Sequence, residues 1–186
     1  MSKSTASEKT SSKSAAASGN GKKAAVKNGL SSVFDPEKAQ QEYEKRKKSQ
    51  LEAIRKTDKQ VLRDMLYQMV LGRQFEQKCA EVYRIGKIGG FCHLYIGQEA
   101  IAVGIQTQLA EKDFLIGSYR DHVQAMAQGI SPESVMAELY GKADGNVGGK
   151  GGSMHMFSKE HNFYGGHGIV GGQIGVATGL AFAQKY

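Results

Sequence analysis

Histidines and one tyrosine–arginine pair are the residues of this sequence whose types suit chemistry near neutral pH. Five histidines lie from residue 93 onward, and no two of them have the H-x-x-x-H spacing of a helical zinc site. His93 and His122 each follow the predicted end of an element, where a side chain can face a cleft. Tyr119 and Arg120, at the polar tip of a predicted strand, offer donors suited to an oxyanion or a phosphate. The structural alternative is that Arg120 forms a surface salt bridge to Asp121 or to a neighbouring helix.

The glycine-rich stretch FYGGHGIVGGQ has the G-x-G-x-x-G spacing of dinucleotide-binding turns, at Gly166, Gly168 and Gly171. That fingerprint requires an apolar strand before it and an acidic residue about 20 residues after it, and the sequence has neither. The stretch GNVGGKGGS departs from the P-loop pattern at two positions. These glycines therefore indicate a loop whose backbone approaches another group closely, or a flexible loop.

Several helices and one short strand are predicted to position these residues. Helical spacing of apolar residues predicts an amphipathic helix from a capping box in TDKQ, residues 57–60, to about Tyr83. GQEAIAVGIQTQLA predicts another helix, and DFLIGSYR predicts a short buried strand. Ser131 and Pro132 begin a further helix, PESVMAELYG, while small residues in GGQIGVATGLAFAQKY predict a helix packed closely among neighbours. This alternation favours an α/β fold.

The charge distribution divides the chain into three parts. Residues 1–33 hold six lysines and one glutamate, a net charge of +5 out of the total of +7. We predict a disordered basic tail over residues 1–33, a charged helical segment over residues 34–60 and a globular part over residues 61–186. The tail has no arginine and no aromatic residue, so we expect no nucleic-acid partner. A basic-tailed binding module is the non-enzymatic alternative.

Targeting signals and cysteines bear on the compartment. No stretch reaches the roughly 18 apolar residues that cross a bilayer, so we expect no membrane partner. The sequence lacks a secretory peptide and the arginines of a transit peptide, which favours a bacterial cytoplasm over a mitochondrial matrix. The two cysteines are too few for a disulfide framework, and we expect reduced thiols with Cys79 in the core.

Five stretches together resemble one family of enzymes. They are GRQFEQKCAEVY, GGFCHLYIGQEAIAVG, SYRDH, GKGGSMHMF and FYGGHGIVGGQIGVATGLAFAQKY. In this order they resemble the α subunits of thiamine diphosphate-dependent 2-oxo acid dehydrogenases (E1 components), over residues 62–186. FCHLYIGQEA and GIVG are similar to the pyruvate type, while acetoin dehydrogenases and other 2-oxo acid dehydrogenases remain alternatives.

The resemblance implies roles for particular residues. Tyr119 and Arg120 would bind the cofactor diphosphate and the substrate, and Gly168 and Val170 would meet the aminopyrimidine ring through their backbone groups. His93 would be catalytic and hold the 2-oxo acid. His122, a second catalytic candidate, would orient the same pocket, and His167 would help to order the loop.

The resemblance also implies a thiamine diphosphate-binding fold with a parallel sheet flanked by helices, incomplete at its C-terminal end. Its cofactors would be thiamine diphosphate and Mg²⁺, and its partners a β subunit in an α2β2 heterotetramer and the lipoyl-bearing E2 dihydrolipoyl acetyltransferase core. The family's Gly-Asp-Gly motif and later asparagine would follow Tyr186, so we expect the metal ligands beyond this chain's end. We therefore expect an N-terminal fragment without decarboxylase activity by itself.

Overall fold

The computed structural model describes residues 35–186, and the tail expected over residues 1–33 lies outside this range. The described residues fall into two units that meet between Arg55 and Lys56. In the first unit the helix α1, Pro36–Lys56, begins after Asp35, whose Oδ1 accepts the N–H groups of Glu37 at 3.0 Å and Lys38 at 3.2 Å. No residue of α1 is buried, as its charged sequence leads one to expect.

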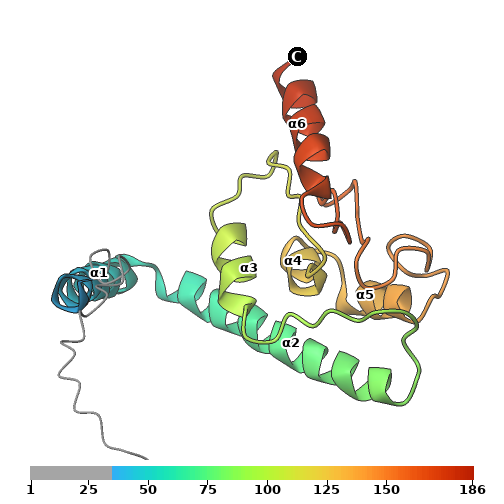
Figure 1. The fold of residues 1–186 in the computed structure, drawn as a ribbon, viewed down its shortest axis with the longest axis horizontal. Helices are drawn as coiled ribbons and strands as arrows, with labels where there is room; N and C mark the ends of the chain where they lie inside the picture. The colour runs from blue at the N-terminus through green and yellow to red at the C-terminus, as the bar shows by residue number, and fades with distance from the viewer. Residues whose placement is uncertain (1–34) are drawn as a thin grey trace, which may run out of the picture. The chain divides into compact units, whose positions relative to one another are not determined.

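Five helices and the loops between them form the second unit (Figure 1). The helices are α2 (Lys59–Arg84), α3 (Glu99–Gln106), α4 (His122–Ala127), α5 (Pro132–Leu139) and α6 (Gly172–Lys185). The helices α2, α3 and α4 contact one another, and α5 packs against α4. No helix among residues 35–186 combines the length and the apolar character needed to span a bilayer.

Local capping explains where α2 and α5 begin. The N-cap of α2 is Asp58, whose Oδ1 accepts the N–H of Gln60 at 2.7 Å, and not Thr57 as the predicted capping box requires. Ser131 caps α5 through a hydrogen bond from the N–H of Ser134 to its Oγ at 3.1 Å, with Pro132 in the first turn. The prediction for α5 is thus confirmed.

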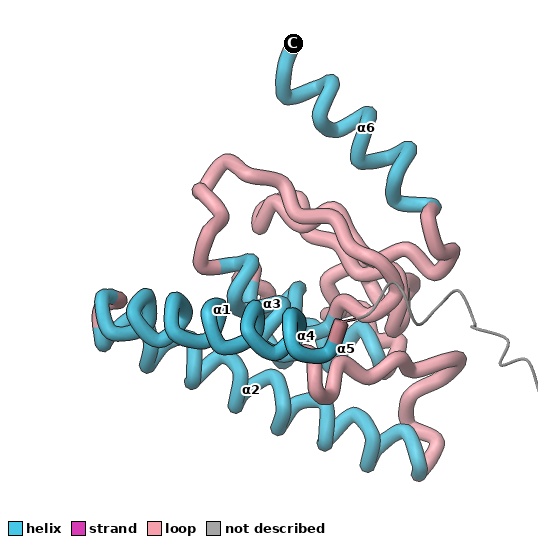
Figure 2. The backbone as a smooth tube through the Cα atoms, turned by 60° about the vertical axis from the view of Figure 1, so that its left-hand side comes forward, coloured by secondary structure: helices cyan, strands magenta, loops and turns pink. Residues whose placement is uncertain are grey.

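The predicted strand in DFLIGSYR does not form, and residues 35–186 contain no strand (Figure 2). Leu115 makes a single parallel bridge to Phe163. Around it, the N–H of Leu115 donates to the carbonyl of Asn162 at 2.9 Å, and the N–H of Gly117 donates to the carbonyl of Gly165 at 2.8 Å. A strand requires partners along its length, whereas this stretch pairs with one loop at isolated points.

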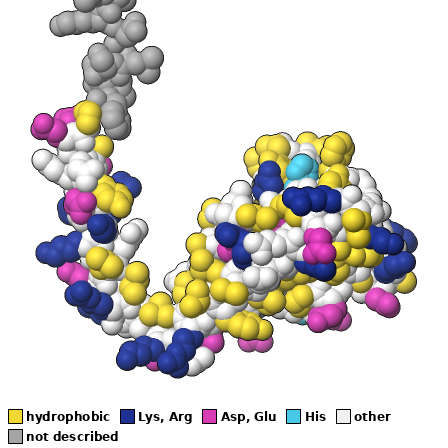
Figure 3. Space-filling model, turned by 90° about the horizontal axis from the view of Figure 1, so that it is seen from below, with side chains coloured by type: hydrophobic (Ala, Val, Ile, Leu, Met, Phe, Trp, Pro, Cys, Tyr) yellow, Lys and Arg dark blue, Asp and Glu magenta, His cyan; other side chains and the backbone are white. Residues whose placement is uncertain are grey.

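The core lies between the C-terminal half of α2 and the helices α3, α4 and α5. Cys79 is fully buried there, as predicted, together with Val123, Val135 and Phe163. The apolar residues of the N-terminal half of α2 were also predicted to face a core, but Leu66 is 61% exposed. Hydrophobic side chains are accordingly visible on the molecular surface (Figure 3).

The helix α6 extends away from α2, α3, α4 and α5 (Figure 1). None of its residues is buried, so the predicted close packing of this helix is wrong. Its small residues have no facing helix within the described part of the chain. One hydrogen bond, from Nε2 of Gln184 to the carbonyl of Lys112 at 3.0 Å, joins it to an earlier loop.

The carboxylate of Glu138, at the end of α5, organises the glycine-rich loop that follows. Oε2 accepts the N–H groups of Val147 at 2.8 Å and Gly149 at 2.9 Å, while Oε1 accepts those of Gly151 at 2.6 Å and Gly152 at 3.1 Å. Burial raises the pKa of this carboxyl, but the four backbone donors outweigh burial and hold the pKa below its ordinary value. The glycine-rich loop therefore has a defined shape.

Replacing Glu138 with glutamine should destabilise the chain, because an amide N–H₂ group would face two backbone donors. We expect a loss of about 3 kcal/mol in the free energy of unfolding, measured by urea denaturation. Glu133→Gln, at an exposed position of the same helix, should change it by less than about 0.5 kcal/mol. Equal effects of the two substitutions would contradict this role of Glu138.

Candidate active site

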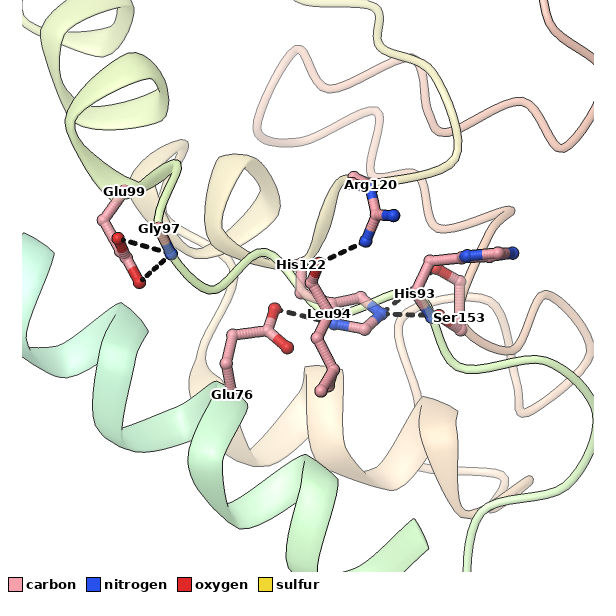
Figure 4. A network of polar contacts seen from close by, with 8 residues as sticks. All are labelled: Glu76, His93, Leu94, Gly97, Glu99, Arg120, His122 and Ser153. Atoms are coloured by element: carbon pink, nitrogen blue, oxygen red, sulfur yellow. Dashed lines mark hydrogen bonds and ion pairs between the residues drawn. The ribbon is translucent and has the colours of Figure 1, made fainter.

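A loop over residues 85–98 carries His93, and the carboxylate of Glu99, which binds Gly97 (Figure 4), fixes the end of that loop. Arg73 of α2 donates to Glu99 through Nε at 2.6 Å and Nη2 at 3.0 Å. The N–H of Gly97 donates to the same carboxylate at 3.1 Å. The hydrogen bond from Arg73 is the main reason that the pKa of Glu99 is lowered to about 2. The start of α3 and the end of the loop are thereby tied to α2.

Three residues predicted to form a site lie together. The rings of His93 and Tyr119 meet edge to face, with centroids 4.8 Å apart. The guanidinium of Arg120 lies 5.4 Å from the centroid of the Tyr119 ring. Nη1 of Arg120 donates to the carbonyl oxygen of Leu94 at 2.5 Å (Figure 4). The residues SYR and the loop bearing His93 therefore form one continuous surface.

A cavity of about 420 Å³ opens beside Tyr119 and Arg120. Val170, a third predicted cofactor residue, also lines it, together with Tyr95 and Gln124. Within residues 35–186, Arg120 has no ion pair with a carboxylate, so the alternative of a salt bridge to Asp121 is not realised. The cavity thus presents a cation that lacks an acidic partner in the described chain, as a site for an anionic group requires.

Each of the three glycines with the dinucleotide-like spacing is explained by its own local surroundings. A side chain at Gly166 would collide with the Asp121 carboxylate, and a Cβ at Gly168 would come within 3.1 Å of the His155 ring. Gly171 has φ of 86°, a left-handed conformation, at the N-cap of α6. Gly168 does not line the cavity, and its close neighbour is the ring of His155.

His122, the first residue of α4, is completely buried and points into the interior (Figure 4). Its Nδ1 lies 2.8 Å from Oε1 of Glu76, and its Nε2 lies 2.8 Å from Oγ of Ser153 and 3.1 Å from the Ser153 carbonyl. Ser153 Oγ also accepts the N–H of His93 at 3.0 Å. His122 is therefore linked through Ser153 to the backbone of His93, whereas the ring of His93 contacts Tyr119 directly.

The surroundings of His122 favour its protonated form. Burial lowers the pKa of the imidazole, but the hydrogen bond to Glu76 and the negative charges of Glu76 and Asp121 outweigh burial, and the pKa is raised. The carbonyl oxygen near Nε2 can only accept a hydrogen bond, and so can an ionised Glu76. Both ring nitrogens of His122 are therefore assigned as donors.

Asp121 is a second buried carboxyl group next to this pair. It is fully buried, and neither of its side-chain oxygens has a hydrogen-bond partner within the described residues. Burial is the main cause that raises its pKa to about 7. Its carboxylate lies so close to Gly166 that a side chain at that position would not fit.

The raised pKa of Asp121 predicts a specific pH dependence. Between the ordinary value of about 4 and the folded value of about 7, the folded chain keeps a proton that the unfolded chain releases. The free energy of unfolding should therefore fall as pH rises through this window, and Asp121→Asn should flatten the profile. Urea denaturation at a series of pH values tests this, with the exposed Asp144→Asn as the control. An unchanged slope in Asp121→Asn would contradict the assignment.

Glu76, Cys79 and His122 offer one possible ligand atom each, all within 4.8 Å of one another, the one such group among residues 35–186. This donor set does not fit Mg²⁺, which takes oxygen ligands in octahedral geometry. Burial also raises the pKa of the Cys79 thiol and keeps it protonated. The hydrogen bond between His122 and Glu76 accounts for their proximity without a metal.

Glu76 and Ser153 are the residues of this network that our sequence analysis missed. In the sequence, Glu76 is one residue after Phe75 and three before Cys79, so a carboxylate on a buried helical face was a usable signal. Ser153 gives no comparable signal, because its partners lie 31 and 60 residues away along the chain.

Comparison with known proteins identifies relatives of this chain. The model of the family "Dehydrogenase E1 component" matches residues 67–186. The pyruvate dehydrogenase E1 component subunit alpha of Rhizobium meliloti (strain 1021) is 60% identical over 119 residues, 64% of this chain and 34% of the relative. The subunit of the same name from Zymomonas mobilis is 54% identical over 130 residues, 69% of this chain and 37% of the relative.

A plant protein is also similar to the chain. It is the Arabidopsis thaliana pyruvate dehydrogenase E1 component subunit alpha-3, chloroplastic, 53% identical over 118 residues, 63% of this chain and 28% of the relative. The chain thus spans about a third of the length of the curated relatives it matches.

Proposed function

Since the chain belongs to the dehydrogenase E1 component family, we propose that it functions as the α subunit of a pyruvate dehydrogenase E1 component. The reaction would be oxidative decarboxylation of pyruvate with transfer of the acetyl group to the lipoyl group of E2. The observation that carries this proposal is the grouping of His93 with the cavity-lining residues Tyr119, Arg120 and Val170. Acetoin or another 2-oxo acid is the alternative substrate.

The cavity fits the diphosphate of thiamine diphosphate. Arg120 supplies a fixed cation without a carboxylate partner in the described chain, and Tyr119 supplies a hydroxyl on the same wall. When bound, thiamine diphosphate supplies the electron sink that decarboxylation of a 2-oxo acid requires. Mg²⁺ remains part of the proposal, although residues 35–186 hold no set of ligands that fits this ion.

The remaining residues orient and enclose the reactants. His93, held against Tyr119, would donate a hydrogen bond to the 2-oxo acid and keep its carbonyl close to the cofactor. Val170 lines the cavity, so its backbone would meet the ring of the cofactor. The same role for Gly168 rests on the resemblance, since this residue lies against His155.

The partners and the compartment are also proposals. A β subunit in an α2β2 assembly and an E2 core follow from the resemblance, as does a parallel sheet in the complete fold. The exposed apolar residues of α2 and α6 suit such an assembly. A bacterial cytoplasm is our proposed location, supported by the relatives from Rhizobium meliloti and Zymomonas mobilis. The relative from Arabidopsis thaliana is named as chloroplastic, so family membership alone does not fix the compartment.

A chimeric enzyme tests this function. In the Rhizobium meliloti α subunit, the aligned segment would be replaced by residues 67–186 of this chain, and the product would be purified with its β subunit. We expect thiamine diphosphate-dependent decarboxylation of pyruvate within about tenfold of the parent rate. A folded, assembled chimera that prefers acetoin, or that is inactive, would contradict the proposal.

Substitutions in the chimera should separate cofactor binding from turnover. Arg120→Ala removes a charge-assisted contact and should raise the half-saturating thiamine diphosphate concentration at least about tenfold. His93→Ala should lower kcat on pyruvate about tenfold or more and leave that concentration within about twofold. Arg84→Ala, at an exposed position at the end of α2, is the control. If His93→Ala impaired kcat and thiamine diphosphate binding equally, His93 would instead be a residue that binds the cofactor.

A further inference from the structure

A chain of hydrogen bonds that passes through buried side chains joins four separate segments of the second unit (Figure 4). It runs from Glu76 in α2 to His122 at the start of α4, and from His122 to Ser153 after the glycine-rich loop. Ser153 Oγ then holds the backbone N–H of His93, 60 residues earlier in the sequence. No other side chain forms a hydrogen bond with this N–H among the described residues.

The directions of these bonds are consistent with one arrangement of hydrogens. His122 donates from Nδ1 to Glu76 and from Nε2 to Oγ and the carbonyl oxygen of Ser153. Ser153 Oγ also accepts from the N–H of His93. A single hydroxyl group thus links the His122 ring to the backbone of His93.

The side chains that form this series of hydrogen bonds are buried. Glu76 and His122 are 0% exposed and Ser153 is 3% exposed, so water does not replace a broken link without rearrangement. His93 is itself only partly buried, with its ring against Tyr119. A small shift of the His93 backbone would therefore move the ring relative to the cavity, where displacements near 1 Å are costly for catalysis.

A nucleophilic triad is the competing interpretation of the same three side chains. The distances of 2.8 Å from Ser153 to His122 and from His122 to Glu76 resemble those of such a triad. However, a His122 that donates from both nitrogens has no lone pair with which to accept the serine proton. Ser153 is also buried and does not line the cavity beside Tyr119. A structural role thus fits better than a nucleophilic one.

We propose that Glu76 and Ser153 are positioning residues that fix the backbone of His93 beside Tyr119, Ser153 directly and Glu76 through His122. Glu76 holds the orientation of the His122 ring, His122 holds Ser153, and Ser153 holds the loop that presents His93. Glu138 supports the same arrangement, since it binds the N–H groups of Gly151 and Gly152 directly before Ser153. The catalytic consequence rests on the proposed function, whereas the positioning itself does not.

Amide hydrogen exchange on the ¹⁵N-labelled chain tests the positioning directly. The His93 amide should be protected in the wild type and should exchange at least about tenfold faster in Ser153→Ala, because its acceptor is gone. The His93 amide should also exchange faster in Glu76→Gln. If Glu76→Gln does not fold, Ser153→Ala alone decides the question. Ser158→Ala removes the other serine–histidine hydrogen bond, to His161 at 2.8 Å, and should leave the His93 amide unchanged.

Two exchange results would overturn the proposal. One is a His93 amide that is unprotected in the wild type, and the other is equal protection in the wild type and Ser153→Ala. Neither result depends on enzymatic activity. A failure of the proposed function would be seen separately, as a chimera without substitutions that is inactive.

Kinetics in the chimera add a measurement that general destabilisation would not reproduce. Ser153→Ala should lower kcat on pyruvate about tenfold and leave the half-saturating thiamine diphosphate concentration within about twofold. Ser158→Ala should leave both values unchanged. An unchanged kcat in Ser153→Ala, or a loss confined to cofactor affinity, would contradict positioning of His93 by Ser153.

Discussion

The buried pair of Glu76 and His122 is the interaction on which the candidate site depends. Taking two charged groups out of water costs free energy, and such a pair is tolerated when further hydrogen bonds satisfy its polar atoms. Here Ser153 supplies two acceptors to Nε2 of His122, while Oε2 of Glu76 has no hydrogen-bond partner in the described chain. The pair is therefore poor as a source of stability and well suited to fixing one arrangement of α2, α4 and two loops.

Two other carboxylates extend this arrangement by binding backbone groups. Glu138 gathers four N–H groups of the glycine-rich loop, and Glu99 holds the N–H of Gly97 while Arg73 holds Glu99. Residues 35–186 contain no strand, so these contacts supply the order that a sheet would otherwise give to the loops. The result is that His93, Tyr119 and Arg120, carried by irregular segments, meet at one place.

The sequence was informative where a signal is local. Ser131 and Pro132 predicted the start of α5, and apolar spacing predicted the extent of α2, because caps and helical periodicity depend on neighbouring residues. Residue type and position made His93, Tyr119 and Arg120 candidates before the resemblance gave them roles, and the structure brings them together. Their chemical roles remain predictions.

The features that the sequence did not reveal depend on distant partners. The six residues of α4 are too few to show a helical period, and Leu115 could form a strand only with a ladder of partners that the described chain lacks. Burial of His122 depends on Glu76, 46 residues away, so its predicted access to a cleft was not realised. Small residues in α6 predicted close packing, but none of its residues is buried.

The most direct test of this account is the protonation of His122, read from the ¹⁵N chemical shifts of its imidazole ring near pH 7. Burial opposes the charge, yet the hydrogen bonds to Glu76 and Ser153 and the negative charges of Glu76 and Asp121 raise its pKa. We predict that both ring nitrogens carry slowly exchanging protons, with shifts typical of an imidazolium. A neutral ring with one unprotonated nitrogen would contradict the buried ion pair and the assignment of both nitrogens as donors.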